Sequence, residues 1–335
     1  MTFDKITLAH GAGGSMSHEL MDKIIDPVIG NPALEVFHDG ARLSPGGDIA
    51  FTTDSYVVNP RFFPGGNIGK LSVCGTVNDL AMTGAEPIGL SLALIIEEGF
   101  PVAELQEILH TIKNAADEAG VSIVTGDTKV VGNGSADGLF INTAGVGRII
   151  DGTDIAPSNI RPGMDIIISG TIGDHAATVM ASRHGIDIPD SLKSDCAPLN
   201  GLASKMLKAV PEIACMRDPT RGGVAATLNE LAQQSGVGML LDEESLPVRE
   251  ETRGVSDILG FDVLELANEG KLLAFCPHER TEELLSVMHG HKYGREACVI
   301  GKTIDKAAGE VGLRTALGSI RVVGMPMGAI VPRIC

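Results

Sequence analysis

Four aspartates stand at the ends of apolar, strand-like segments, where their side chains could converge on a cation. They are Asp39, Asp54, Asp79 and Asp127. Several carboxylates at one spot suit a hard cation such as Mg²⁺, which prefers oxygen ligands and usually shares them with phosphate. Any one of these aspartates taken alone is more often a turn or cap residue. Their shared context therefore favours a magnesium and phosphate site.

Two glycine-rich turns, residues 10–17 and 218–223, could hold the phosphate. Each precedes a helix-like apolar segment, and free backbone N–H groups at a helix N-terminus form an anion site. Neither turn is a Walker A loop, because neither contains the Gly-Lys-Ser or Gly-Lys-Thr sequence. Turn spacing alone is a weak signal for phosphate binding.

Lys129 and Glu269 are candidate acid and base groups. Lys129 comes just after Asp127, and a lysine near phosphate neutralises charge. A glutamate partly withdrawn from water can have its pKa raised into a useful range. Taken alone, either residue fits a surface salt bridge better than a catalytic role.

The last residue of the chain, Cys335, is the strongest candidate nucleophile. The spacing of the six cysteines shows no disulfide or metal motif, so free thiols are expected, with the other five buried in the core. From Gly318 the chain is rich in Gly and Pro, which prevents a terminal helix, yet it keeps apolar residues that would prefer to dock in a groove. This pattern indicates a swinging arm that carries the thiol; the alternative is a frayed terminus.

Composition excludes several classes of protein. The 335 residues carry a formal net charge of −17, which opposes binding to a nucleic-acid backbone. The most apolar stretch, residues 88–96, is far shorter than the ~20 residues of a membrane-spanning helix. No basic segment followed by an apolar run opens the chain, so we expect a cytoplasmic location.

The elements that must position these residues alternate between helix and strand periods. The helix at 65–82 presents Ser72, Gly75, Thr76 and Asp79 as a small polar stripe, which suits close approach of a ligand or, alternatively, tight packing. Mixed elements in both halves predict an α+β or α/β fold of about two domains, with a boundary within 151–163. Strands are expected at 51–58, 121–125, 139–146 and 164–169, and further helices at 101–120, 174–184 and 223–235.

Taken together, the motifs resemble the HypE family of nickel–iron hydrogenase maturation factors. The resemblance runs from the N-terminal glycine loop to the last residue, and the terminal Pro-Arg-Ile-Cys is its most specific part. The chain departs from the family at Asn67, where Asp is frequent, and at His38, where paired acids are common. The matching segments are 51–58, 63–66, 68–70, 75–82, 96–100, 126–129, 218–223 and 332–335.

The resemblance implies the fold of the superfamily that contains aminoimidazole ribonucleotide synthetase, selenophosphate synthetase and thiamine-phosphate kinase. Residues 1–155 would form an ATP-binding and dimerisation domain, whose sheet pairs with that of a second copy into a barrel. Residues 156–322 would form an α+β domain, and residues 323–335 a mobile tail. A homodimer is therefore expected.

The resemblance also implies the reaction, which is ATP-dependent dehydration of an S-carbamoyl group on Cys335 to a thiocyanate. HypF would supply the carbamoyl group, and the HypC–HypD complex would accept the cyanide. In this scheme Cys335 carries the group, Lys129 contacts phosphate or the carbamoyl oxygen, and Glu269 accepts protons. Gly11, Gly13, Gly14, Asp54, Asp79, Asp127, Asp218 and Arg221 would bind ATP, and Asp39, Asp54, Asp79 and Asp127 would bind Mg²⁺.

Two alternatives stay open at this point. The chain could be another ATP-using enzyme of the superfamily that phosphorylates a free small molecule, which leaves Cys335 without a role. It could also be a thiol or metal carrier in hydrogenase assembly, although no Cys or His stands at metal-motif spacing from Cys335.

Overall fold

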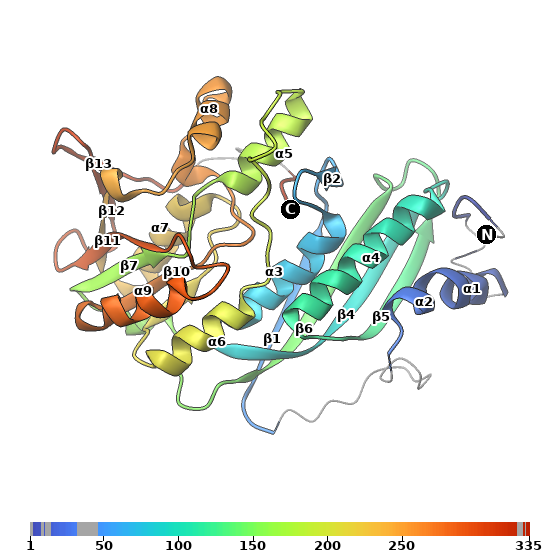
Figure 1. Cartoon of the computed structure of the whole chain (residues 1–335), viewed down its shortest axis with the longest axis horizontal. Helices are drawn as coiled ribbons and strands as arrows, with labels where there is room; N and C mark the ends of the chain where they lie inside the picture. The colour runs from blue at the N-terminus through green and yellow to red at the C-terminus, as the bar shows by residue number, and fades with distance from the viewer. Residues whose placement is uncertain (1–2, 8–9, 11–14, 32–45, 327–330, 332) are drawn as a thin grey trace.

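A computed structural model describes residues 3–7, 10, 15–31, 46–326, 331 and 333–335. The predicted site residues Gly11, Gly13, Gly14 and Asp39 lie outside these ranges. Within them the chain forms two lobes, each built on its own sheet, and the C-terminus lies between the lobes near α5 and β2 (Figure 1).

The first lobe is a four-stranded sheet covered by two helices on one face (Figure 1). Its strand order is β1-β6-β4-β5, and only β4 and β5 are parallel, because helix α4 crosses over between them. Its elements are β1 (Ile49–Tyr56), α3 (Ile68–Met82), β4 (Ala85–Glu97), α4 (Val102–Ala119), β5 (Ile123–Val131) and β6 (Leu139–Ile149). The short pieces before and beside them are α1 (Ser15–Leu20), α2 (Asp26–Ile29), β2 (Phe62–Phe63) and β3 (Gly66–Asn67).

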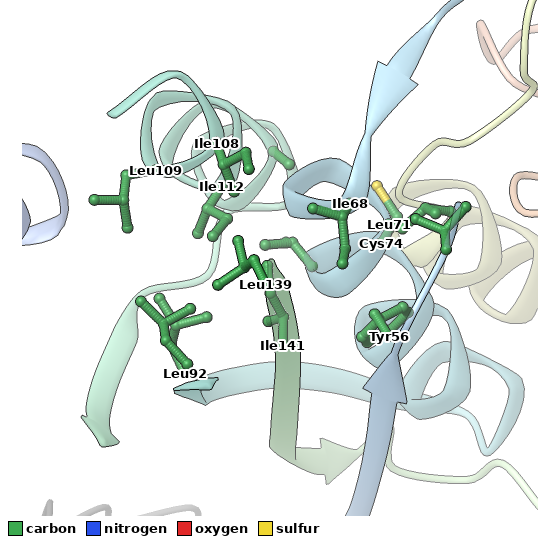
Figure 2. Close-up of a cluster of buried hydrophobic side chains, with 14 of the residues drawn as sticks. Tyr56, Ile68, Leu71, Cys74, Leu92, Ile108, Leu109, Ile112, Leu139 and Ile141 are labelled. Carbon is green, nitrogen blue, oxygen red and sulfur yellow. The ribbon is translucent and has the colours of Figure 1, made fainter. Parts of the chain in front are cut away.

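Aliphatic side chains fill the space between the helices and the sheet. Figure 2 shows Ile108 and Ile112 of α4 and Ile68 of α3 in one cluster with Leu92 and Ile141 of the strands. The spacing of the α4 residues places them on one face of the helix, as predicted, so this face is removed from water.

Helix α3 is buried on nearly every side, which explains its small polar stripe. Thr76 Oγ1 lies 2.5 Å from Thr143 Oγ1, and the Ser72 carbonyl oxygen accepts a hydrogen bond from Thr143 at 2.8 Å. A Cβ on Gly75 would lie 2.2 Å from the hydroxyl oxygen of Tyr56. The alternative of tight packing is therefore correct for the first three stripe residues, which bring α3 close to the strands.

Asn67 has a structural role at the start of α3. Its side-chain oxygen caps α3 by accepting hydrogen bonds from the main-chain N–H groups of Gly69 and Lys70. Its amide nitrogen donates to Thr111 Oγ1 at 3.0 Å. These three contacts employ both polar atoms of the side chain in fixing the start of the helix.

The second lobe is a seven-stranded sheet in the order β13-β12-β9-β11-β7-β10-β8. Its strands are β7 (Met164–Ile168), β8 (Cys215–Arg217), β9 (Gly238–Asp242), β10 (Leu273–Pro277), β11 (Cys298–Ile304), β12 (Val311–Arg314) and β13 (Ile320–Val322). Its helices are α5 (Asp174–His184), α6 (Asn200–Ala209), α7 (Gly223–Ser235), α8 (Glu250–Leu259) and α9 (Thr281–His289).

The predicted α+β fold in two sheet-based units is confirmed. Both sheets are open within one chain, so the barrel across a dimer stays a prediction. The exact domain bounds also stay a prediction, while the chain passes from the first sheet to the second between residues 149 and 164. In the described ranges, no helix has the length and apolar character needed to cross a membrane.

Candidate active site

The end of the chain docks between the two lobes. The main-chain N–H groups of Val57 and Asn59 donate to the carbonyl oxygens of Cys335 and Arg333, at 3.1 and 3.2 Å. Arg333 returns a hydrogen bond from Nε to the Val57 carbonyl oxygen at 2.8 Å, and Ile334 is buried in the first core. The described end of the predicted swinging arm therefore lies inward and is hydrogen-bonded to the backbone that follows β1.

Cys335 is half-buried, and several charged groups influence its thiol. Burial raises the pKa of the thiol well above its usual range, and the negative charge of Glu269 raises it further. Arg221 acts in the opposite direction, and Asp54 and Asp218 add smaller increases. Predicted residues from three other segments thus influence the thiol electrostatically, and its neutral form is favoured.

Glu269 is buried and incompletely hydrogen-bonded. Its Oε1 atom has no hydrogen-bond partner among the described residues. Its main chain is fixed, because its N–H donates to Asp195 Oδ1 at 3.0 Å and Asn78 Nδ2 donates to its carbonyl oxygen at 3.3 Å. Burial, followed by the Cys196 thiol and then the Asp218 and Asp195 carboxyl groups, raises the pKa of Glu269 well above its usual range. A buried carboxyl group with a raised pKa suits proton transfer.

Asp79 and Asp218 line one cavity of about 300 Å³ between the first sheet and β8. Thr52 Oγ1 donates to Asp79 Oδ2 at 2.8 Å, and burial raises the pKa of Asp79. Burial and then the charge of Asp79 raise the pKa of Asp218 to about 7. Two carboxyl groups that disfavour each other's ionisation are a setting that a divalent cation would relieve.

The donor set fits Mg²⁺ only if phosphate oxygens complete it. No group of three or more His, Cys, Asp or Glu side chains within the described ranges is arranged to hold a metal ion. Mg²⁺ is commonly bound by one or two carboxylates together with substrate phosphates and water. Asp79 and Asp218 supply the two carboxylates that such a site needs.

The sheet register separates Asp127 and Lys129 from this cluster. Asp127 lies in a row with Ala93, Asn142 and Ser55, so its side chain shares the face of Ser55. Asp54 is the next residue before Ser55 and points to the opposite face, where α3 packs. The exposed Asp127 pairs with Lys129 at 3.0 Å. One chain alone therefore does not bring these two residues to the thiol.

The second glycine turn owes its glycines to packing. Gly222 and Gly223 have φ values of 75° and 60°, and a Cβ on Gly223 would lie 2.5 Å from the Leu264 and Leu266 carbonyl oxygens. Helix α7 begins at Gly223, as predicted. Asp218, at the start of this turn, reaches the cavity described above, while Arg221 is exposed.

Sequence reasoning missed the residues that hold the tail. His175, the second residue of α5, contacts the Ile334 carbonyl oxygen through Nε2 at 2.9 Å. Arg183 Nη2, near the end of the same helix, donates to the Arg333 carbonyl oxygen at 2.9 Å. A single His after a glycine turn carries no sequence signal. Only the folded chain brings these side chains to residues 333–335.

Two family models match the chain, and together they define the class of protein. Residues 36–149 match the N-terminal domain of AIR synthase related proteins, and residues 161–314 match the C-terminal domain. These matches span most of both lobes, so the chain has the two-domain architecture of this superfamily.

More similar proteins identify the family within that class. The carbamoyl dehydratase HypE of Rhodobacter capsulatus is 47% identical over 99% of this chain and 98% of its own length. A crystal structure of the hydrogenase maturation protein HypE in complex with ATP is 44% identical, with a TM-score of 0.95 over 98% of this chain and 99% of that chain. A crystal structure of a HypE–HypF complex is 45% identical, with a TM-score of 0.81 over 93% of this chain and 100% of that chain.

The chain belongs to the HypE family of carbamoyl dehydratases. The predicted family membership and the predicted enzyme class, a dehydratase that acts in hydrogenase maturation, are both confirmed. The roles of individual residues stay predictions.

Proposed function

We propose that this chain uses ATP to dehydrate a carbamoyl group carried on the thiol of its own Cys335, giving a thiocyanate that supplies cyanide to a hydrogenase iron centre. The observation that supports the proposal is the docked tail, whose terminal thiol interacts electrostatically with Glu269, Arg221 and Asp218. A HypE relative has been crystallised with ATP, which supports ATP as the cofactor.

ATP would supply a phosphoryl group that turns the carbamoyl oxygen into a good leaving group. The chain's own part is to bind, orient and move protons. Asp79 and Asp218 would hold Mg²⁺ together with phosphate oxygens, and Arg221 would offset negative charge. Glu269, once ionised, would accept a proton from the carbamoyl nitrogen. The buried setting of Cys335 would keep water from the intermediate.

We further propose a homodimer formed through the open face of the first sheet. Phe51 and Ile95 are 68% and 42% exposed on that face, although both are large apolar residues. Asp127 and Lys129 lie on the same face. A second copy packed on this face would cover the apolar side chains and bring Asp127 and Lys129 to the interface. We expect ATP and its phosphates to bind near that interface.

The proposed partners follow from the reaction. HypF would donate the carbamoyl group, and a HypE relative has been crystallised in a complex with HypF. HypC–HypD would accept the cyanide, and the reaction would take place in the cytoplasm.

Mass spectrometry of the C-terminal peptide tests the proposed reaction. Carbamoylated chain mixed with ATP and Mg²⁺ should lose the mass of one water from the Cys335 peptide, and the Cys335→Ala variant should show no modified peptide. ATP consumption with the carbamoyl mass retained would contradict the proposal. Full turnover of a free small molecule by Cys335→Ala would favour the other superfamily activity, and stoichiometric metal that is lost in this variant would favour a carrier.

A further inference from the structure

The His175 side chain is held in one tautomer by its contacts. Its imidazole is fully buried, with Nε2 2.9 Å from the Ile334 carbonyl oxygen and Nδ1 2.8 Å from Ser194 Oγ. A carbonyl oxygen only accepts hydrogen bonds, so Nε2 carries the proton and Nδ1 is the acceptor. The Ser194 hydroxyl then donates to Nδ1, and its oxygen accepts the Cys196 N–H at 3.2 Å.

Both ring nitrogens of the imidazole therefore have hydrogen-bond partners, and Nε2 points toward the C-terminal tail. Phe63 closes one side of the imidazole, with ring centroids 5.4 Å apart at 87°. The contacted carbonyl belongs to Ile334, the residue immediately before the thiol. His175 lies in the second lobe, whereas the Val57 amide that holds Cys335 belongs to the first. The thiol is therefore fixed from both lobes at consecutive residues.

We propose that His175 is a positioning residue for the reaction: its Nε2–H holds the Ile334 carbonyl and keeps the Cys335 thiol beside Glu269. The kinetic consequence of this inference rests on the proposed function, whereas the placement of the tail does not. Without this donor, the buried Ile334 carbonyl oxygen would have no hydrogen bond in the docked tail. In the undocked tail, water would donate a hydrogen bond to the same oxygen, so the undocked state would be favoured.

Two substitutions of His175 distinguish the contribution of Nε2 from that of Nδ1. The side-chain nitrogen of Gln reaches about as far from the backbone as Nε2, and the side chain of Asn about as far as Nδ1. His175→Gln should keep the donor to Ile334, while His175→Asn should keep only the contact with Ser194. His110, exposed on α4, provides a matched control as His110→Gln.

Alkylation of Cys335 by iodoacetamide, followed on the C-terminal peptide by mass spectrometry, tests the placement without ATP or a carbamoyl group. We expect slow alkylation in the wild type, His175→Gln and His110→Gln, and alkylation about tenfold faster in His175→Asn and His175→Ala. Equal rates in all the variants, or protection by Asn as good as that by Gln, would overturn the proposal.

The second test uses the wild-type protein, so it does not depend on whether a variant folds. Its nitrogen-15 spectrum at neutral pH should show a slowly exchanging Nε2–H on His175, and an Nδ1-protonated or doubly protonated ring would overturn the assignment. In single turnover of the carbamoylated chain, His175→Asn should lower the maximal rate and leave the KM for ATP unchanged, with the rate restored in His175→Gln. If alkylation differs between the variants as expected but the maximal rate does not, the role of His175 in the reaction would be contradicted. Its role in placing the tail would still hold.

Discussion

The main-chain N–H of Val57 donates to the carbonyl oxygen of Cys335 at 3.1 Å, which joins the end of the first strand to the end of the chain. Because β1 is an edge strand of its sheet, its continuation has backbone groups free to accept another segment. Residues 57–59 bind the C-terminal residues of the chain in this way, so the position of the Cys335 thiol depends on contacts that single substitutions can weaken.

Arg333→Ala should release the tail. The Nε hydrogen bond to the Val57 carbonyl oxygen is lost, together with the 2.7 Å pair with Asp137. We expect Cys335 alkylation to become about tenfold faster, because a partly buried hydrogen bond is worth about 1 kcal/mol or slightly more. Asp137→Asn removes only the exposed pair and should change the rate less than about threefold. A larger effect of Asp137→Asn than of Arg333→Ala would contradict this.

Glu269→Gln should remove the proton acceptor while keeping the fold. The wild-type single-turnover rate should rise with pH, because the pKa of Glu269 is raised and only its ionised form accepts a proton. The variant should be slower by about 10²- to 10⁴-fold and should lack this pH dependence. A variant rate within threefold of the wild type, measured by mass spectrometry of the Cys335 peptide, would rule out this role.

Asp218→Asn should stabilise the free protein at alkaline pH. The folded pKa of Asp218 is raised from 3.8 to about 7, so its ionisation opposes folding increasingly as pH rises through that window. Each pKa unit corresponds to about 1.4 kcal/mol, so the variant should gain a few kcal/mol above pH 7 and nothing below about pH 4. Urea unfolding at both pH values in the presence of EDTA measures this. A gain that is equal at both pH values would show another cause.

Phe51→Glu should disrupt the proposed homodimer. A charge on the apolar open face of the first sheet would have to be buried in the interface without a partner. Sedimentation velocity should show monomer for this variant and dimer for the wild type. Leu317→Glu, which changes a residue 96% exposed in the second lobe, is the matched control and should stay dimeric. A monomeric wild type, or a dimeric Phe51→Glu, would count against this interface.

Gly75→Ala should destabilise the first lobe, because the new Cβ would lie 2.2 Å from the Tyr56 hydroxyl oxygen inside a packed core. A loss of about 1–3 kcal/mol is expected. Gly254→Ala in α8 has no described atom within 4 Å of the new Cβ and should instead gain about 0.5–1 kcal/mol from helix propensity. Thermal unfolding of both variants gives the comparison, and the same sign for both would contradict the steric explanation.

Much of the fold could be predicted because it rests on local patterns. The apolar spacing from Val102 to Ile112 and the stop at Gly120 define α4 without reference to the rest of the chain. The Pro-Arg-Ile-Cys sequence singles out Cys335 as a candidate in the same way, because it is a contiguous motif. The resemblance to the HypE family rests on such contiguous motifs as well.

Tertiary structure alone decided which candidates meet. The alternation of side chains along a strand places Asp54 on the helix-covered face and Asp127 on the open face, and this depends on strand register. Likewise, the raised pKa of Glu269 and the hydrogen bond between His175 and the Ile334 carbonyl oxygen depend on segments that are distant in sequence. Sequence by itself predicted most of the elements and the candidate thiol, because local periodicity and contiguous motifs are enough for those. Long-range packing, which sets burial and distance, determined the site around that residue.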